Sequence, residues 1–349
     1  MSEKFDNLKS KLALDSLIKK SRVHFYKPIQ IAEILFRDRV FGDFDIKNIE
    51  TYRNESKKWR DEICKLLVGR VSTSSQKYQD DLFNKNAIPP QLINELAVEN
   101  KKNNGNVEAY IYKRFKHKFS DLSDALNYCE RHNSDTFKLN EFLDNFSSKP
   151  GLKRSIDKIY EITVYSLFSN LIEEMGIKIK LQINNDKKDL INDFEDFTKK
   201  IFGLNNPYTL NEYPAKLFRV GITNAADRGL DMWANFGLAI QIKHISLTEE
   251  IAFNIGQSIQ ADRIIIVCKD AEHKIISSII NQLGIKSQIQ SIITLSELKN
   301  WYSKCMNSKY QSKLGNKIID SLKKQIKIEF PSSENQYINQ FIKSREYKI

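Results

Sequence analysis

Apolar residues recur at helical spacing through the first part of the chain. Leucine and isoleucine return every three or four positions over residues 8–20 and 28–39, which predicts two helices. Residues 48–83 then predict a basic helix, a short Gly-Arg-Val joint and a second helix with a start rich in serine and threonine. This order is the outline of a helix-turn-helix unit, although the outline alone is common.

The pattern changes after a polar break, SSKPG, at residues 147–151. Residues 156–175 keep a helical apolar period, whereas residues 177–183 alternate apolar and polar positions as a half-buried strand does. Residues 184–226 are predicted to form an insertion that contains a helix over about 189–202. We expect the SSKPG break at residues 147–151 to be the domain boundary.

The stretch GLDMWANFGLAIQIKH, residues 229–244, predicts two strands folded back around residues 234–237. Ser246-Leu-Thr-Glu249 resembles a capping box that would start a helix. The remaining predicted elements are strands over 263–268 and 289–293 and helices over about 271–283 and from Leu295. A helix, a three-strand meander, a helix and a strand indicate an α/β order with a mixed sheet.

We therefore expect three regions in this α/β protein. Residues 1–148 are expected to be mainly helical, residues 149–300 to hold the mixed sheet, and residues 301–349 to form a basic helical segment.

Composition favours a nucleic-acid partner. The formal net charge is +11, which attracts polyanions, and a membrane surface is the competing partner. The apolar runs are far shorter than the ~20 residues that span a bilayer, and the first residues contain no apolar signal segment. The four cysteines are scattered without Cys-x-x-Cys spacing, so reduced thiols are expected. We expect a cytoplasmic protein without a membrane partner.

The predicted hairpin places three polar side chains together. If the chain reverses at residues 235–236, Asp231 lies opposite or diagonal to Gln241, within side-chain reach. Gln241 and Lys243 share one face of their strand because side chains alternate, and Ile240 and Ile242 take the other face, toward the core. The hairpin therefore presents a carboxylate, an amide and an ammonium.

These groups suit phosphodiester hydrolysis, which needs a carboxylate to hold Mg²⁺ and a cation near the attacking water. We predict Asp231, Gln241, Lys243 and Glu161 as catalytic residues, with Glu161 supplied by the 156–175 helix. The predicted metal ligands are Asp231, Glu161 and the backbone carbonyl of Ile242. The same spacing is also compatible with an exposed cross-strand ion pair between Asp231 and Lys243, worth little in itself.

Residues 152–270 resemble the PD-(D/E)xK nuclease superfamily in its Gln-x-Lys variant. The strings YKPIQIAEILFRDR, TYRNESKKWRDEI and GLDMWANFGLAIQIKH resemble the HaeII-type restriction endonucleases, and this resemblance runs over most of the chain. It implies a mixed-sheet PD-(D/E)xK nuclease core with an N-terminal, mainly helical DNA-binding domain. The superfamily usually has Asp or Glu where this chain has Gln241, so one carboxylate is absent from the strand.

The resemblance implies a type II restriction endonuclease that cleaves double-stranded DNA at a GCGC core flanked by a purine and a pyrimidine, and a companion DNA methyltransferase. A palindrome has twofold symmetry, so we expect a homodimer with one active site on each strand. Two alternatives stay open: a repair or structure-selective nuclease of the same fold, and a non-catalytic helix-turn-helix DNA-binding protein.

DNA contacts are predicted in three places, where phosphate contacts give affinity and base-edge contacts give sequence choice. The predicted residues are Arg53, Lys57, Lys58 and Arg60 in the basic helix, Arg70, Ser72, Thr73, Ser74, Ser75 and Lys77 at the start of the second helix, and Arg219, Asn224 and Arg228 before the hairpin. The alternative for the basic helix is an ordinary solvated face.

Overall fold

The computed structural model describes residues 9–21, 24–73, 75–149, 152, 155–182, 185–203, 211–220, 230–259, 261–270, 289–331 and 337–348. Contacts between residues divide the chain into two compact units. Unit 1 comprises Met1–Thr163, Gly221–Ala226 and Ile319–Ile349, and unit 2 comprises Val164–Val220 and Asp227–Ile318. This division differs from the expected three regions, because it falls inside a helix and joins the C-terminal segment to the N-terminal region.

Unit 1 is built from helices, as its apolar periodicity predicts. They are α2 (Lys9–Lys20), α3 (Tyr26–Val40), α4 (Arg53–Val68), α5 (Gln76–Asp80), α6 (Pro90–Lys102), α7 (Asn106–Arg131), α8 (Leu139–Ser147), most of α15 (Asn316–Glu329), and α16 (Tyr337–Ser344). The periods over residues 8–20 and 28–39 correspond to α2 and α3, so both predicted helices are confirmed.

The C-terminal residues belong to unit 1 because they complete a buried polar cluster in its core. Arg345 pairs with Glu33 of α3 at 2.9 Å, and the hydroxyl of Tyr347 donates to Glu108 of α7 at 2.7 Å. Both carboxylates are almost fully buried. Burial of an unpaired charge is costly, so these contacts fix the end of the chain against α3 and α7.

The helix-turn-helix outline is present in part. Helix α4 ends at Val68, and the next residue, Gly69, has a φ of 78°, the left-handed conformation that favours glycine after a helix end. Helix α5 has five residues and is followed by the 3₁₀ turn η2 (Asp81–Phe83). The predicted second helix is therefore little more than one turn long.

Unit 2 contains a five-stranded mixed sheet in the order β3-β4-β5-β6-β7. The strands are β3 (Leu217–Arg219), β4 (Met232–Ala234), β5 (Leu238–Ser246), β6 (Arg263–Asp270) and β7 (Ile289–Thr294). Strands β3, β4 and β5 pair antiparallel, whereas β5, β6 and β7 pair parallel. The predicted α/β class with a mixed sheet is confirmed.

One strand of the predicted meander belongs to a different sheet. Strand β1 (Lys178–Leu181) pairs only with β2 (Asn211–Pro214), in a separate two-stranded sheet. The meander begins instead with β3, which lies within the expected insertion. Local alternation identifies a strand but not its partner, and a strand of three residues is too short to carry a period.

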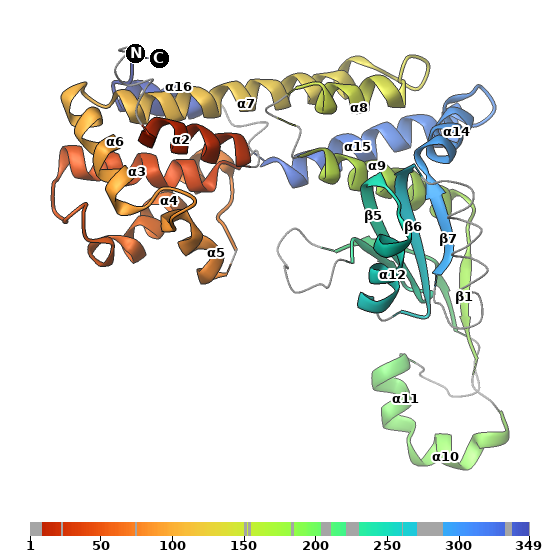
Figure 1. Cartoon of the computed structure of the whole chain (residues 1–349). Helices are drawn as coiled ribbons and strands as arrows, with labels where there is room; N and C mark the ends of the chain where they lie inside the picture. The colour runs from red at the N-terminus through yellow and green to blue at the C-terminus, as the bar shows by residue number, and fades with distance from the viewer. Residues whose placement is uncertain are drawn as a thin grey trace. The chain divides into compact units, whose positions relative to one another are not determined.

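Helices pack against the five-stranded sheet. Helix α9 (Ile156–Glu174) precedes β1, and α12 (Glu249–Ser258) lies across β5 and β6 (Figure 1). The hydroxyl of Thr248 caps α12 by accepting from the backbone of Ile251, so the predicted cap at Ser246 is wrong; Ser246 ends β5. Helix α14 (Leu295–Met306) begins with a capping box. The predicted helix over 271–283 lies outside the described residues.

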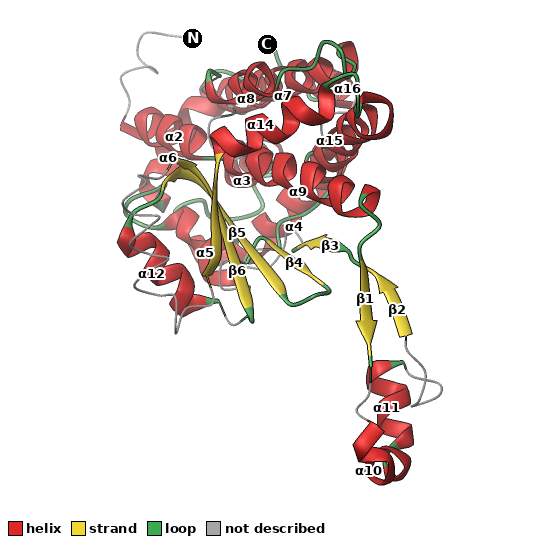
Figure 2. Cartoon of the chain, turned by 90° about the vertical axis from the view of Figure 1, so that its right-hand side faces the viewer, coloured by secondary structure: helices red, strands yellow, loops and turns green. Residues whose placement is uncertain are grey.

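The two-stranded sheet carries a pair of short helices at its far end, away from the five-stranded sheet (Figure 2). They are α10 (Lys188–Asp193) and α11 (Glu195–Phe202), preceded by the 3₁₀ turn η4 (Asn185–Lys187). The single helix predicted over 189–202 is thus interrupted at Phe194. We call β1, β2, α10 and α11 together the arm.

None of the helices in the described ranges is long and apolar enough to cross a membrane.

Candidate active site

The turn between β4 and β5 sets the register of the hairpin. Gly237 has a φ of +80°, and a Cβ atom there would lie 3.1 Å from a carboxylate oxygen of Asp262. The side chain of Asn235 accepts from the backbone of Lys216 at 2.8 Å and donates to the carbonyl of Pro214 at 3.0 Å. Glycine is the residue that adopts this conformation without strain, so the turn is specified locally.

This register brings Asp231 to Gln241. Met232 stands opposite Ile240, and the next residue outward, Asp231, donates its backbone N–H to the carbonyl of Ile240 at 3.3 Å. Oδ2 of Asp231 accepts from Nε2 of Gln241 at 2.8 Å and from the backbone N–H of Ile242 at 2.7 Å. The predicted approach of Asp231 to Gln241 is confirmed.

The carbonyl of Ile242 lies on the same side of β5 as this carboxylate. The N–H and C=O of one strand residue point to the same neighbouring strand. Since the N–H of Ile242 faces Asp231, its carbonyl also points to the β4 side, beyond the last residue pair of the hairpin. A carboxylate and a carbonyl thus border one region at the end of β4.

These oxygens fit a magnesium ion. In the described part of the chain, no cluster of three or more His, Cys, Asp or Glu side chains is arranged to hold a metal. Mg²⁺ is commonly bound by one or two carboxylates and completes its shell with waters and substrate phosphate oxygens. Asp231 would supply one carboxylate and Ile242 one carbonyl oxygen, which is the smaller number of carboxylates that such sites use.

Lys243 lies on the predicted face, with Gln241. In register it stands beside Cys268 of β6, and its side chain is half-buried. Within the described ranges, no carboxylate forms an ion pair with Lys243. Asp231 bonds to Gln241 and Ile242, so the alternative of a simple Asp231–Lys243 ion pair is wrong.

The two faces of β5 are both covered. Ile240 and Ile242 are buried, as predicted. Gln241 is buried as well, at 2% exposure, and its neighbour Ala239 packs in an apolar cluster with residues of α12. Asp231 and Lys243, on the same face as Gln241, are both half-buried.

An exposed aromatic pair shares the face of Asp231. The rings of Phe218 and Trp233 stack with centroids 4.5 Å apart and planes at 21°. Trp233 is two residues after Asp231, so strand alternation places both on one face. Both rings remain exposed. This pair was not predicted from the sequence, although the Asp-x-Trp spacing marks the shared face.

Glu161 is positioned by α9 in unit 1, whereas the hairpin belongs to unit 2. Its carboxylate is buried and accepts from Nζ of Lys158 at 2.5 Å. Its predicted role beside Asp231 stays a prediction.

The predicted DNA contacts on α4 differ in accessibility. Lys58 is well exposed and pairs with Glu55 at 2.7 Å. Arg53 pairs with Glu50 of the 3₁₀ turn η1 (Ile49–Thr51) at 3.0 Å. Lys57 is more enclosed and pairs with a carboxylate of α5 at 2.9 Å. These lysines and this arginine already have carboxylate partners that a phosphate would have to replace.

Arg60 is not available for such a contact. It is 2% exposed, and its guanidinium bonds to Asp61, Gln30 and Gln79. It lies one helical turn before Cys64, which is fully buried, so it is on the core face of α4. The prediction that Arg60 contacts DNA is therefore corrected: Arg60 holds α3, α4 and α5 together.

The start of the second helix presents several of the other predicted residues. The hydroxyl of Ser75 caps α5 by accepting from the backbone of Tyr78, and Thr73 and Lys77 are exposed. Ser72 is half-buried, and Arg70 contacts the ring of His24. Ser74 lies outside the described residues.

The predicted contacts before the hairpin are described only in part. Arg219 stands opposite Met232, so alternation assigns it to the face of Ile240, which is not the face of Asp231. Asn224 and Arg228 lie outside the described residues.

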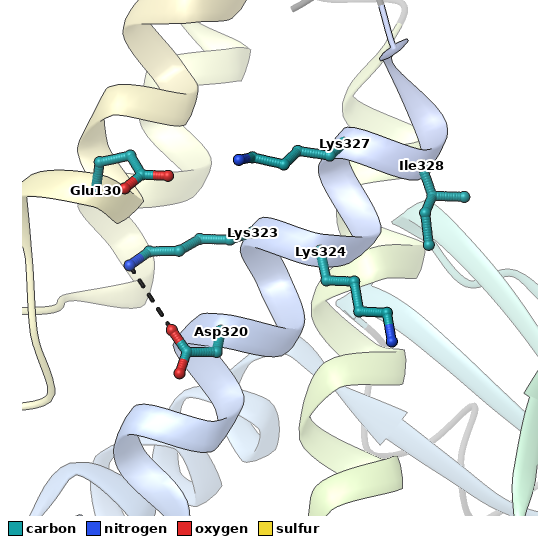
Figure 3. A pocket seen from close by; sticks show the side chains of 6 residues that line it. All are labelled: Glu130, Asp320, Lys323, Lys324, Lys327 and Ile328. Atoms are coloured by element: carbon teal, nitrogen blue, oxygen red, sulfur yellow. Dashed lines mark ion pairs between the residues drawn. The ribbon is translucent and has the colours of Figure 1, made fainter. Parts of the chain in front are cut away.

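A hollow in unit 1 is a separate feature (Figure 3). Three lysines of α15 line it with Asp320, Ile328 and Glu130 of α7, and Lys323 pairs with Asp320 at 3.8 Å. The other lysines are Lys324 and Lys327. Acidic and basic groups are mixed here, so the hollow has the character of an ordinary charged surface.

Comparisons with known proteins provide evidence that is independent of the geometry of the site. The sequence matches the HaeII restriction endonuclease family over residues 10–347. It is 55% identical to the type II restriction enzyme HaeII of Haemophilus aegyptius over 338 residues, covering 97% of this chain and 96% of that protein. It is 50% identical to the type II restriction enzyme NgoBI of Neisseria gonorrhoeae over 342 residues, covering 97% of each chain. No solved structure matches it.

Proposed function

The chain belongs to the HaeII restriction endonuclease family, and from this premise we propose that the β4–β5 hairpin is its catalytic centre, with Asp231 and Lys243 acting on a DNA phosphodiester. The protein is a type II restriction enzyme, a site-specific deoxyribonuclease whose substrate is DNA. Such enzymes generally use divalent metal ions. We propose which residues of the chain carry out this reaction.

One observation carries the proposal. The carboxylate of Asp231 is held by two donors of β5, Nε2 of Gln241 and the N–H of Ile242, at the end of the strand that also bears Lys243. Fixed donors keep a ligand oxygen in place before the ion and the substrate arrive, which lowers the cost of assembling the site.

A magnesium ion bound there would polarise the scissile phosphate and lower the pKa of a bound water. Asp231 and the carbonyl of Ile242 would hold the ion. Gln241 orients Asp231 through its amide. Lys243 stabilises the negative charge that develops on the phosphate, because its ammonium lies on the same face and has no carboxylate partner in the described part of the chain. Glu161 is proposed as a further ligand or water-orienting base.

The proposed DNA contacts lie on or near two neighbouring helices of unit 1. Exposed or half-buried residues near the start of α5 and on α4 are proposed to contact DNA; these are Arg53, Lys57, Lys58, Arg70, Ser72, Thr73, Ser75 and Lys77. Family membership supports a GCGC-centred palindrome, two copies of the chain on one DNA site, and a companion methyltransferase that protects the host. A PD-(D/E)xK core is proposed for unit 2 from the mixed sheet and its hairpin.

The test is digestion of a sequenced plasmid with Mg²⁺, followed by sequencing of the fragment ends. Discrete fragments with one shared end sequence are expected from the wild-type protein. Asp231→Asn removes the charge and keeps the shape of the side chain, so we expect DNA binding in Ca²⁺ without cleavage in Mg²⁺. Cleavage at the wild-type rate by this variant would refute the site.

A control variant tests whether the loss of cleavage is specific to the hairpin. Lys304 is exposed on α14, outside the hairpin. Lys304→Ala removes one positive charge from unit 2, and we expect it to cleave like the wild type. If Asp231→Asn and Lys304→Ala lose cleavage to the same extent, the loss is not specific to the hairpin, and the assignment to Asp231 fails.

A further inference from the structure

Phe218 and Trp233 form an exposed aromatic pair that the proposed chemistry does not use. Phe218 is 36% exposed and Trp233 is 44% exposed, although their rings stack with centroids 4.5 Å apart. Single exposed apolar residues are ordinary on a protein surface. Two large rings that stack on each other and still expose apolar surface on one sheet face indicate a contact surface instead.

The aromatic pair lies beside the part of the sheet face that α12 covers. Trp233 stands opposite Ala239 in the hairpin, and Ala239 packs in the apolar cluster with residues of α12. The pair itself lies on β3 and β4, and β3 is the edge strand of the five-stranded sheet (Figure 2). Among the described residues, this face is therefore covered at Ala239 and exposed at Trp233 and Phe218, one and two strands further out.

The turn of the hairpin holds the pair in register. Phe218 stands opposite Trp233 in the β3–β4 ladder. The side chain of Asn235 accepts from the backbone N–H of Lys216 at 2.8 Å, and the N–H of Asn235 donates to the carbonyl of Lys216 at 3.2 Å. These bonds fix β3 against the turn, so both rings are ordered before a ligand arrives, and such ordering lowers the cost of binding.

The surroundings of the pair favour DNA as the occupant. Asp231 is two residues before Trp233 on the same face, a separation of about 7 Å along the strand. Lys216 is exposed, is two residues before Phe218 and continues the ladder beside Asn235, so alternation assigns its side chain to the same face. Along the strand direction, the rings therefore lie between the proposed metal ligand and a cation suited to a phosphate.

We propose that Trp233, supported by Phe218, packs against a base within two nucleotides of the scissile phosphate and so positions the DNA strand over Asp231. Nucleotides of one strand are ~3.4 Å apart along the duplex axis, so about 7 Å on the protein corresponds to about two nucleotides. Every base has a face that stacks on an aromatic ring. Access to that face needs a locally unstacked base step, which apolar wedges produce in other DNA-binding proteins. The inference rests on the proposed function, since Asp231 places the scissile phosphate.

Duplexes with single abasic nucleotides test this contact in the full-length protein. The probes carry the site identified by plasmid digestion, with one base removed at each of the two positions on either side of the cleaved bond. In Ca²⁺, Trp233→Ala is expected to lower the affinity for the intact duplex by about 5- to 150-fold, the effect of removing one base stack. Where the contacted base is absent, the same change is expected to cost less than about 2-fold, because no base is left to stack on.

Two control variants separate the contact from a general effect on the protein. Trp233→Phe keeps an aromatic ring opposite Phe218, so we expect it to recover most of the affinity. Phe197→Ala removes a ring from another exposed aromatic pair of unit 2, formed by Phe197 and Phe202 on α11, and we expect it to bind like the wild type. An equal loss in Phe197→Ala overturns the inference, and so does a loss in Trp233→Ala that is the same on the intact and all the abasic duplexes.

Tryptophan fluorescence tests which partner covers the ring. In the variant Trp59→Phe/Trp301→Phe, Trp233 is the only tryptophan of the chain. Binding of the intact duplex in Ca²⁺ is expected to protect it from quenching by acrylamide. Protection that follows protein concentration without DNA would mean that a second copy of the chain covers the pair, and the inference would fail. A protected Trp233 together with cleavage by Asp231→Asn defeats the proposed function alone, whereas an unprotected Trp233 together with an inactive Asp231→Asn defeats this inference alone.

Discussion

Asp231 and Gln241 are joined across the β4–β5 hairpin by a hydrogen bond of 2.8 Å from the amide to the carboxylate. The amide fixes the carboxylate without adding a second negative charge beside it. A carboxylate at 241 would face Asp231 at a distance where two negative charges repel, and the pKa of one of them would rise. Glutamine thus lets the hairpin form without a second carboxylate facing Asp231.

Gln241→Glu tests this relationship. Without metal, repulsion between two carboxylates is expected to lower the thermal stability of the variant. With metal, the second carboxylate adds a ligand, so the Mg²⁺ concentration for half-maximal cleavage is expected to fall. Magnesium titrations of the cleavage rate, alongside melting curves with and without Mg²⁺, measure both effects. A higher magnesium requirement would show that residue 241 does not face the ion.

Lys243→Ala is expected to lower the single-turnover cleavage rate by about 10²–10³-fold, the usual effect of removing one group that stabilises charge in the transition state. DNA affinity in Ca²⁺ should change little. Lys243→Arg keeps the positive charge with a different shape, and we expect it to recover part of the rate. Equal rates for the alanine and arginine variants would indicate that the charge of Lys243 is not used.

Glu161→Gln is expected to slow cleavage less than Asp231→Asn, because Glu161 is proposed as a supporting ligand. The change also weakens the contact with Lys158, whose Nζ lies 2.5 Å from the carboxylate. Lys158→Met removes the same ion pair and keeps the carboxylate, so it is the matched control. If both variants slow cleavage equally at the same Mg²⁺ concentration, the role of Glu161 is structural.

Arg345→Met is expected to destabilise unit 1. It leaves Glu33 buried without its ion-pair partner, and breaking a buried pair in this way costs about 3–5 kcal/mol. Burial raises the pKa of Glu33, so part of the cost is relieved when its carboxyl is protonated. Urea unfolding followed by tryptophan fluorescence measures the change. Lys58→Ala breaks an exposed pair and serves as the control, for which no measurable change is expected.

The free energy of unfolding is expected to fall as pH rises above about 8.5, the usual pKa of a thiol. Burial raises the pKa of Cys129 to about 12 and that of Cys268 to about 11, and it also raises the pKa of Cys64 and Cys305. A raised folded-state pKa favours the folded protein below the unfolded pKa, and this contribution is lost as pH rises toward the folded pKa.

Denaturant unfolding at pH 7, 9 and 10 measures this loss. Cys268→Ala removes one thiol beside Lys243 in the sheet register, so its stability should fall less steeply with pH than that of the wild type. Native thiols should also react slowly with iodoacetamide at pH 8 and quickly after unfolding. A steeper fall in the alanine variant would contradict the assignment.

The sequence by itself determined the hairpin. Strand alternation over residues 238–243 and a glycine at the turn position with φ of +80° both act within a few residues, so the approach of Asp231 to Gln241 follows from local sequence alone. The helices α2 and α3 and the C-terminal end of α9 near Gly176 are predictable for the same reason.

Only the tertiary structure decided which strands share a sheet and which charges face solvent. Strand β1 alternates like a meander strand, yet its partner is β2, because pairing depends on chain segments distant in sequence. Arg60 resembles its basic neighbours in sequence, but Gln30 and Gln79 enclose it from two other helices. The exposed apolar face of α11 could not be predicted from the sequence either. An amphipathic period indicates that the apolar face of a helix is buried. Only the fold shows that nothing in the described chain covers the apolar face of α11.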